Sequence, residues 1–188
     1  MILLAAFVIA AISPTPAPTA TPPPDPCTLV TVVEASALLG YPVLAPDEPT
    51  RRAGRCLFTT RSLSDDGSVA YAIVRAPQLA QLTRYYAIVA RMCAGVAPGA
   101  PREMICKQYV QLAGVTNLDD YFAARTSGSS AQPVPSLGEH AIATDQGLFI
   151  RESDSVLEAN VQRNQLFELE PSLKLAQLLL ERMAPPLH

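Results

Sequence analysis

The four cysteines are the residues of this chain with the clearest chemistry, and their spacing favours disulfide bonds over a metal site or a redox pair. They are Cys27, Cys56, Cys93 and Cys106, and they form neither a C-x-x-C motif nor a common zinc-ligand spacing. An even number of cysteines in an exported chain is typical of a disulfide framework. We expect the sequential pairing, Cys27–Cys56 and Cys93–Cys106, because the Gly- and Pro-rich segment 95–101 turns the chain back after a helix that ends near Cys93. Four free thiols in a cytosolic protein are the alternative.

His140 is the internal histidine, since the second one, His188, is the last residue. Ser136, Glu139 and Asp145 lie near it in the sequence, so a small hydrolase using His140 is one hypothesis. The chain has no Gly-x-Ser-x-Gly motif to present a nucleophile. We therefore predict no catalytic residue and expect His140 at the surface or the edge of a strand.

Two pairs of acids, Asp65-Asp66 and Asp119-Asp120, resemble half of a calcium site. A calcium loop needs more oxygen ligands at set spacing, and both pairs are better explained as residues of a turn and of a helix start. The glycines form no phosphate-binding loop either. The sequence thus predicts no metal and no cofactor.

The charge pattern argues against a nucleic-acid partner. The formal net charge is −3, with acids and bases mixed along the chain. The short basic cluster of Arg51, Arg52 and Arg55 is interpreted as a solvated loop rather than an anion site. The pair Tyr85-Tyr86 falls within a predicted helix, where one ring points inward and the other outward. The outward ring either joins a ligand groove or is a boundary residue.

The N-terminal region reads as an export signal followed by a stiff spacer. The uncharged apolar run Ile2–Ile12 has the length of the apolar part of a signal peptide and is too short for a membrane span. The Pro- and Thr-rich spacer favours extended polyproline II structure. We predict a signal-like segment at 1–13, a proline-rich linker at 14–26 and one disulfide-stapled domain at 27–188. The protein is expected to be extracytoplasmic, secreted or tethered to the cell surface, with membrane contact only through an uncleaved N-terminal segment.

Hydrophobic periodicity and turn residues predict an α+β domain. Thr31 and Glu34 have the spacing of a capping box, and Pro77 suits the first turn of a helix. The expected helices are 32–39, one starting at 77, 117–125 and 171–183, and the expected strands are 55–60, 68–75, 106–112, 141–144, 148–152 and 156–163. This is an antiparallel sheet of about five to six strands packed by three to four helices. The second half repeats the strand–strand–helix order of the first, which suggests an internal duplication.

Four short stretches carry a resemblance to a known group of proteins. They are Pro26-Cys27-Thr28-Leu29, the helix segment Glu34-Ala35-Ser36-Ala37-Leu38-Leu39-Gly40, Cys56-Leu57-Phe58, and Leu137-Gly138-Glu139-His140-Ala141. With them, residues 26–183 resemble small bacterial exported lipoproteins of unknown function, whose fold is similar to the PsbP/Mog1-like α+β sandwich. The chain departs from that group because no lipid-acceptor cysteine follows the apolar run directly. The resemblance implies an extracytoplasmic accessory or binding domain and brings no catalytic residues.

Taken together, the sequence predicts a non-enzymatic binding or accessory domain of the cell envelope. Its partner is expected to be a small apolar or peptide ligand or an envelope protein. Two hypotheses stay open beside it: a secreted hydrolase using His140, and a structural envelope protein that acts through oligomer contacts.

Overall fold

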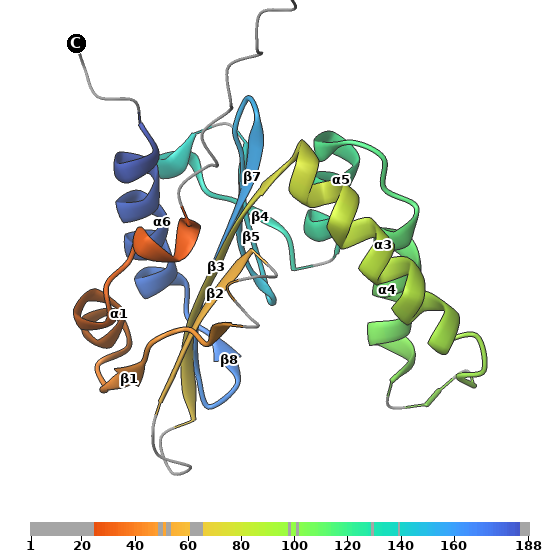
Figure 1. Ribbon diagram of the computed structural model, residues 1–188, viewed down its shortest axis with the longest axis horizontal. Helices are drawn as coiled ribbons and strands as arrows, with labels where there is room; N and C mark the ends of the chain where they lie inside the picture. The colour runs from red at the N-terminus through yellow and green to blue at the C-terminus, as the bar shows by residue number, and fades with distance from the viewer. Residues whose placement is uncertain are drawn as a thin grey trace, which may run out of the picture.

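The computed structural model describes residues 25–48, 51, 54–60, 66–97, 99–100, 102–128, 130–138 and 140–184. Within these residues an antiparallel sheet runs through the middle of the molecule, with helices on both faces (Figure 1). The predicted signal-like segment at 1–13, nearly all of the linker at 14–26, and Glu139 lie outside the described residues.

The sheet is built around two long central strands. Its strands follow the order β1 (Val43–Leu44), β2 (Arg55–Thr60), β3 (Gly67–Arg75), β7 (Ser155–Arg163), β6 (Gly147–Arg151), β5 (Ala141–Thr144) and β4 (Gln132–Pro133), while β8 (Leu166–Phe167) pairs with β7. All pairings are antiparallel. β3 and β7 pair over nine residues. Neither is an edge strand, because β3 also pairs with β2 and β7 also pairs with β6.

The helices form two layers on opposite sides of the sheet. One layer holds α1 (Val32–Leu39) and α6 (Leu169–Met183), and the other holds α3 (Ala76–Met92), α4 (Glu103–Ala113) and α5 (Leu118–Thr126) (Figure 1). The described residues also include two short 3₁₀ turns, η1 (Pro26–Thr28) and η2 (Pro135–Leu137).

Alternation along β3 divides the core between these two layers. Val69, Tyr71 and Ile73 face α1 and α6, whereas Ala72 and Val74 face α3, α4 and α5. Successive side chains of a strand point to opposite faces, so a strand covered on both sides must be apolar at nearly every position. This is why β3 reads as a continuous apolar run rather than as a polar–apolar alternation.

The predicted α+β class and antiparallel sheet are confirmed, and the number of strands is slightly higher than expected. The additional strands, β1, β4 and β8, have two residues each and are too short to show a period. The prediction of a strand at 106–112 is wrong, because these residues belong to α4. Ile105 and Tyr109 have high strand propensity, but Cys106, Tyr109 and Leu112 also recur every three residues, and packing on α3 selects the helix.

The repeated strand–strand–helix order exists along the chain, with α3 after β3 and α6 after β7 and β8. The two helices nevertheless pack on opposite faces of the sheet. A two-fold axis between the antiparallel neighbours β3 and β7 would keep both helices on one face. The two halves are therefore not related by such an axis.

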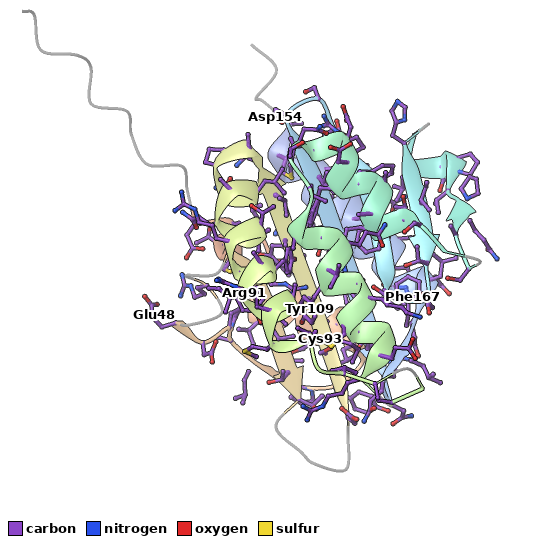
Figure 2. The ribbon with its side chains drawn as sticks, turned by 90° about the vertical axis from the view of Figure 1, so that its right-hand side faces the viewer. Glu48, Arg91, Cys93, Tyr109, Asp154 and Phe167 are labelled. Atoms are coloured by element: carbon purple, nitrogen blue, oxygen red, sulfur yellow. A yellow bond between two sulfur atoms is a disulfide. The ribbon has the colours of Figure 1, made fainter. Side chains whose placement is uncertain are left out.

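Two disulfides join segments that are close in sequence. Cys27 of η1 is bonded to Cys56 of β2, with a Cα–Cα distance of 5.2 Å, and Cys93 is bonded to Cys106 of α4, at 5.5 Å. Figure 2 shows Cys93 at the end of α3. This is the sequential pairing. Such bonds persist in oxidising compartments, so they indicate an extracytoplasmic environment.

The start of α1 is fastened to α6 through one carboxylate. Thr31 and Glu34 form the predicted capping box, in which the Thr31 N–H donates to Oε2 of Glu34 at 2.9 Å. Arg182 of α6 donates to the same oxygen at 3.0 Å. The hydrogen bond from Arg182, followed by that from Thr31, lowers the pKa of Glu34 to about 2.

A Glu34→Gln variant is expected to lose about 1 kcal/mol of stability at neutral pH, because a partly exposed ion pair and a cap contribute little more. A lowered pKa in the folded state stabilises the protein above the unfolded-state value of 4.5, and the gain is lost as the pH falls toward 2. The difference in melting temperature between wild type and variant should therefore shrink across this range. Glu152→Gln, at an exposed acid, is the control, and a difference independent of pH would contradict the assignment.

Candidate functional site

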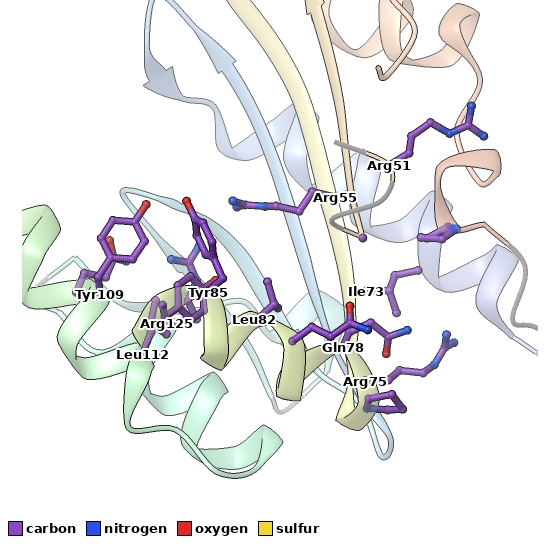
Figure 3. A pocket seen from close by; sticks show the side chains of 16 residues that line it. Arg51, Arg55, Ile73, Arg75, Gln78, Leu82, Tyr85, Tyr109, Leu112 and Arg125 are labelled. Atoms are coloured by element: carbon purple, nitrogen blue, oxygen red, sulfur yellow. The ribbon is translucent and has the colours of Figure 1, made fainter. Parts of the chain in front are cut away.

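A cavity of about 700 Å³ lies between the sheet and the helices α3 and α4 (Figure 3). It extends past the start of β2, so Ile73, which faces α1 and α6, also lines it. Its polar lining is dominated by arginine, tyrosine and glutamine. Its apolar lining comes from the sheet, at Ile73, and from the helices, at Leu82 and Leu112. The residues that matter most are Arg51, Arg55, Arg75, Arg125, Tyr85, Tyr86, Tyr109, Gln78, Ile73, Leu82 and Leu112. No acidic residue lines it among those described.

The pairing of the strands places Arg55 and Glu158 in one row on the face of the sheet that the cavity covers. Arg55 of β2 is opposite Ala72 of β3, Ala72 is opposite Glu158 of β7, and Glu158 is opposite Phe149 of β6. Residues opposite one another in adjacent strands point to the same face, so this row faces α3, α4 and α5. The small side chain of Ala72 leaves room above β3 for the side chains on either side.

The buried carboxylate of Glu158 accepts hydrogen bonds from Tyr121 and Arg125. The Tyr121 hydroxyl donates to Oε1 of Glu158 at 2.6 Å, and Nε of Arg125 donates to the same oxygen at 3.1 Å. Arg125 lies over the ring of Phe149, with its guanidinium carbon 4.7 Å from the ring centre. The guanidinium of Arg55 is 3.8 Å from the other oxygen of Glu158. One carboxylate thus serves two arginines from different elements.

Arg125 keeps its charge although its side chain is only 13% exposed. Burial by itself disfavours the charged form, but the attraction of Glu158 outweighs it, and the pKa of Arg125 is raised. Burial, with the nearby Glu158 charge, also raises the pKa of Tyr121 and of Tyr86. The cluster therefore has two guanidinium groups, one carboxylate and neutral phenols at physiological pH.

Three tyrosines form an aromatic wall at one end of the cavity. The ring centres of Tyr85 and Tyr86 are 5.7 Å apart, and Tyr109 of α4 lies 6.5 Å and 5.8 Å from them. Tyr86 is buried and Tyr85 is 54% exposed, which confirms the prediction of one inward and one outward ring. The bond between Cys93 and Cys106 joins α3 to α4 and so helps to hold Tyr109 beside the pair.

Gln78 supplies an unpaired acceptor at the cavity. Its side-chain oxygen Oε1 is buried and has no hydrogen-bond partner in the described part of the chain. Buried polar atoms are nearly always satisfied, so this oxygen is an exception within the described part of the chain.

His140 is exposed, directly before β5, and it does not line the cavity. Ser136 is exposed as well, and Asp145 accepts a hydrogen bond from Ser130 rather than from the imidazole. No hydrogen bond among the described residues uses the His140 side chain, and Glu139 lies outside them. The structure does not bring these residues together as a Ser/His/acid site.

The acid pairs take part in local structure. Asp119 pairs with Arg151 at 2.7 Å, and the backbone N–H of Asp120 donates to the cap residue Asn117 at 2.8 Å. Asp66 accepts from Gln165, while Asp65 lies outside the described residues. In the part of the chain that is described, no group of three or more histidines, cysteines and acids could hold a metal ion. Nor is any of its helices both long and apolar enough to cross a bilayer.

The basic cluster has a different setting from the solvated loop that was expected. Arg55 is the first residue of β2 and lines the cavity, and so does Arg51, which pairs with Asp25. Arg52 lies outside the described residues. Sequence reasoning missed Arg125 and Glu158 altogether, because neither belongs to a motif. The one signal in the sequence was the outward ring of Tyr85.

Comparison of the chain with protein-family models, with curated proteins and with solved structures yields no match.

Proposed function

We propose that this chain is an extracytoplasmic binding domain, without catalytic activity, whose ligand occupies the cavity between the sheet and the helices α3 and α4. The observation that carries this proposal is the cavity itself. Its volume of about 700 Å³ falls in the range of small-molecule sites. A pocket of this kind combines apolar and aromatic walls with a few polar groups that orient the ligand.

The construction of the cavity supports a binding role. One wall of the cavity is formed by the strands β2 and β3, and the other wall is formed by the helices α3 and α4. Each wall contains or adjoins a disulfide, at Cys56 in β2 and at Cys106 in α4. Walls braced by covalent bonds lose little conformational freedom on binding, which lowers the cost of association.

The proposed place of action is the cell envelope or the space outside it. The disulfides support export, and the segments 1–13 and 14–26 would then serve as signal and spacer. The described domain follows this spacer directly, with η1 beginning at Pro26. A binding domain displayed in this way can meet a ligand from the surroundings.

Leu82→Trp is expected to fill part of the cavity and to weaken binding of the neutral fluorescent probe N-phenyl-1-naphthylamine at least about tenfold, because the larger ring occupies the ligand volume. The wild-type protein should bind this probe saturably, as measured by fluorescence titration of the oxidised full chain. Leu166→Trp is the matched control, since Leu166 lies on β8 and is 70% exposed.

Equal binding by the two tryptophan variants would show that the probe binds elsewhere and would reject the cavity as the site. Circular dichroism and thermal unfolding of both variants establish that they are folded. Absence of any saturable binding to the wild-type protein would also count against the proposal.

A further inference from the structure

Two guanidinium groups of the cavity share a single carboxylate. Arg55 and Arg125 both face Glu158, at 3.8 Å and 3.1 Å, and both line the cavity, whereas Glu158 does not. Arg125 is held by its hydrogen bond to Glu158 and by the ring of Phe149. The three side chains together have one unbalanced positive charge.

Of the two arginines that face Glu158, Arg55 is the one with free donors. Its side chain is 58% exposed, and its separation from Glu158 is longer than a hydrogen bond. No hydrogen bond within the described residues uses its guanidinium group. Figure 3 shows Arg55 extending from its strand across the cavity toward Tyr85, while Arg75 lies at the opposite end. A guanidinium in this position can present two parallel N–H groups to an anion.

An aromatic surface adjoins this charge. Tyr85, Tyr86 and Tyr109 line the same cavity within 6.5 Å of one another, and Leu82 contributes an apolar side chain beside them. Flat rings pack well against tyrosine faces and edges. Tyr85 is 54% exposed, so its ring is accessible to such a partner.

Resting on the function proposed above, we propose that the cavity selects a monoanionic ligand with a ring, such as an aromatic carboxylate. Its anionic group pairs with Arg55 beside Arg125, and its ring packs on Tyr85 and Tyr109. The charge of the cluster decides between classes of anion. The other two arginines of the lining, Arg51 and Arg75, are paired with Asp25 and Asp154, so one positive charge is left over. A carboxylate balances this charge, whereas a phosphate monoester has a charge of about −1.5 to −2 at neutral pH.

The test compares three ligands that share one ring system: naphthalene-2-carboxylate, its neutral methyl ester, and 2-naphthyl phosphate. Their dissociation constants are measured by calorimetry on the oxidised full chain. We expect the carboxylate to bind at least about tenfold more tightly than the ester, because hydrogen bonds to charged groups are strong in a partly buried site. The phosphate is expected to bind more weakly than the carboxylate.

Arg55→Gln should reduce the preference for carboxylate over ester to within about threefold while the ester still binds. The same change at the exposed Arg84 of α3, which is not in the cavity lining, serves as the control and should leave the preference intact. Arg55 is mostly exposed, so its replacement is expected to leave the fold stable, and thermal unfolding verifies this.

The results separate this inference from the function on which it rests. Equal binding of carboxylate and ester to the wild type overturns the charge selection and leaves a neutral ligand site. An equal loss of preference in both arginine variants overturns the role of Arg55. Tighter binding of the phosphate overturns the choice of a monoanion. If none of the three ligands binds while N-phenyl-1-naphthylamine still does, the selection of an anionic ring ligand is overturned and the binding function stands; if that probe fails to bind as well, the binding function is rejected.

Discussion

Glu158→Ala is expected to lower the free energy of unfolding by about 3–5 kcal/mol, as removal of one partner from a buried ion pair generally does. The side chain of Glu158 is 10% exposed and that of its partner Arg125 is 13% exposed. Without the carboxylate, a buried guanidinium keeps its charge with no acid to balance it, and the buried hydroxyl of Tyr121 loses its acceptor. Urea denaturation of the oxidised protein measures the loss.

Two variants make this result specific. Glu152→Ala removes an exposed acid and is expected to change stability by less than about 0.5 kcal/mol. The double variant Glu158→Leu with Arg125→Met replaces both charges by apolar groups and should recover much of the loss, because neither charge is then buried alone. A cost below about 1 kcal/mol for Glu158→Ala would mean that water reaches the cluster and that the site is less enclosed than described.

Replacing Cys27 and Cys56 together by serine is expected to cost about 3–4 kcal/mol, the second of the two large effects. The bond closes a segment of 29 residues, so its loss restores conformational freedom to the unfolded chain. It also releases η1 from β2, and Cys27 and Cys56 both belong to the core beneath α1 and α6. Guanidinium unfolding of the oxidised wild type and of the variant measures the difference.

The matching change at Cys93 and Cys106 should cost somewhat less, about 3 kcal/mol, since that bond closes 13 residues. A reductant should lower the free energy of unfolding of the wild type by about as much as the two double replacements do together. It should leave the variant that lacks all four cysteines unaffected. Should the wild type be equally stable with and without reductant, the bonds would contribute nothing, and the argument for an oxidising compartment would lose its basis.

Local chemistry explains which elements could be predicted. The helix at 32–39 was correct in both bounds because Thr31 and Glu34 cap its start and Gly40, with φ at 82°, ends it. The strands at 55–60 and 141–144 were also correct in both bounds. Each of these signals acts over a few residues, so it is readable in the sequence alone.

Packing decided the elements that were missed. Within residues 106–112, Tyr109 and Val110 favour a strand, whereas the lysine, the glutamines and the leucine suit a helix equally well. The segment is helical, and α4 packs against α3. In α6 the fully buried residues are Ser172, Leu175, Ala176 and Leu179. Three consecutive leucines, 178–180, fit more than one stripe, and only contact with the sheet selects among them.

The sequence by itself determined the α+β class, the bounds of several elements, and a sequential disulfide pairing, because those depend on neighbours within a few tens of residues. Tertiary structure alone decided the cavity. Arg55, Ala72 and Glu158 share a row only through the register of β2, β3 and β7, and Arg125 reaches that row from α5. Strand register is set by pairing across the whole sheet, and no local pattern encodes which distant charges will meet.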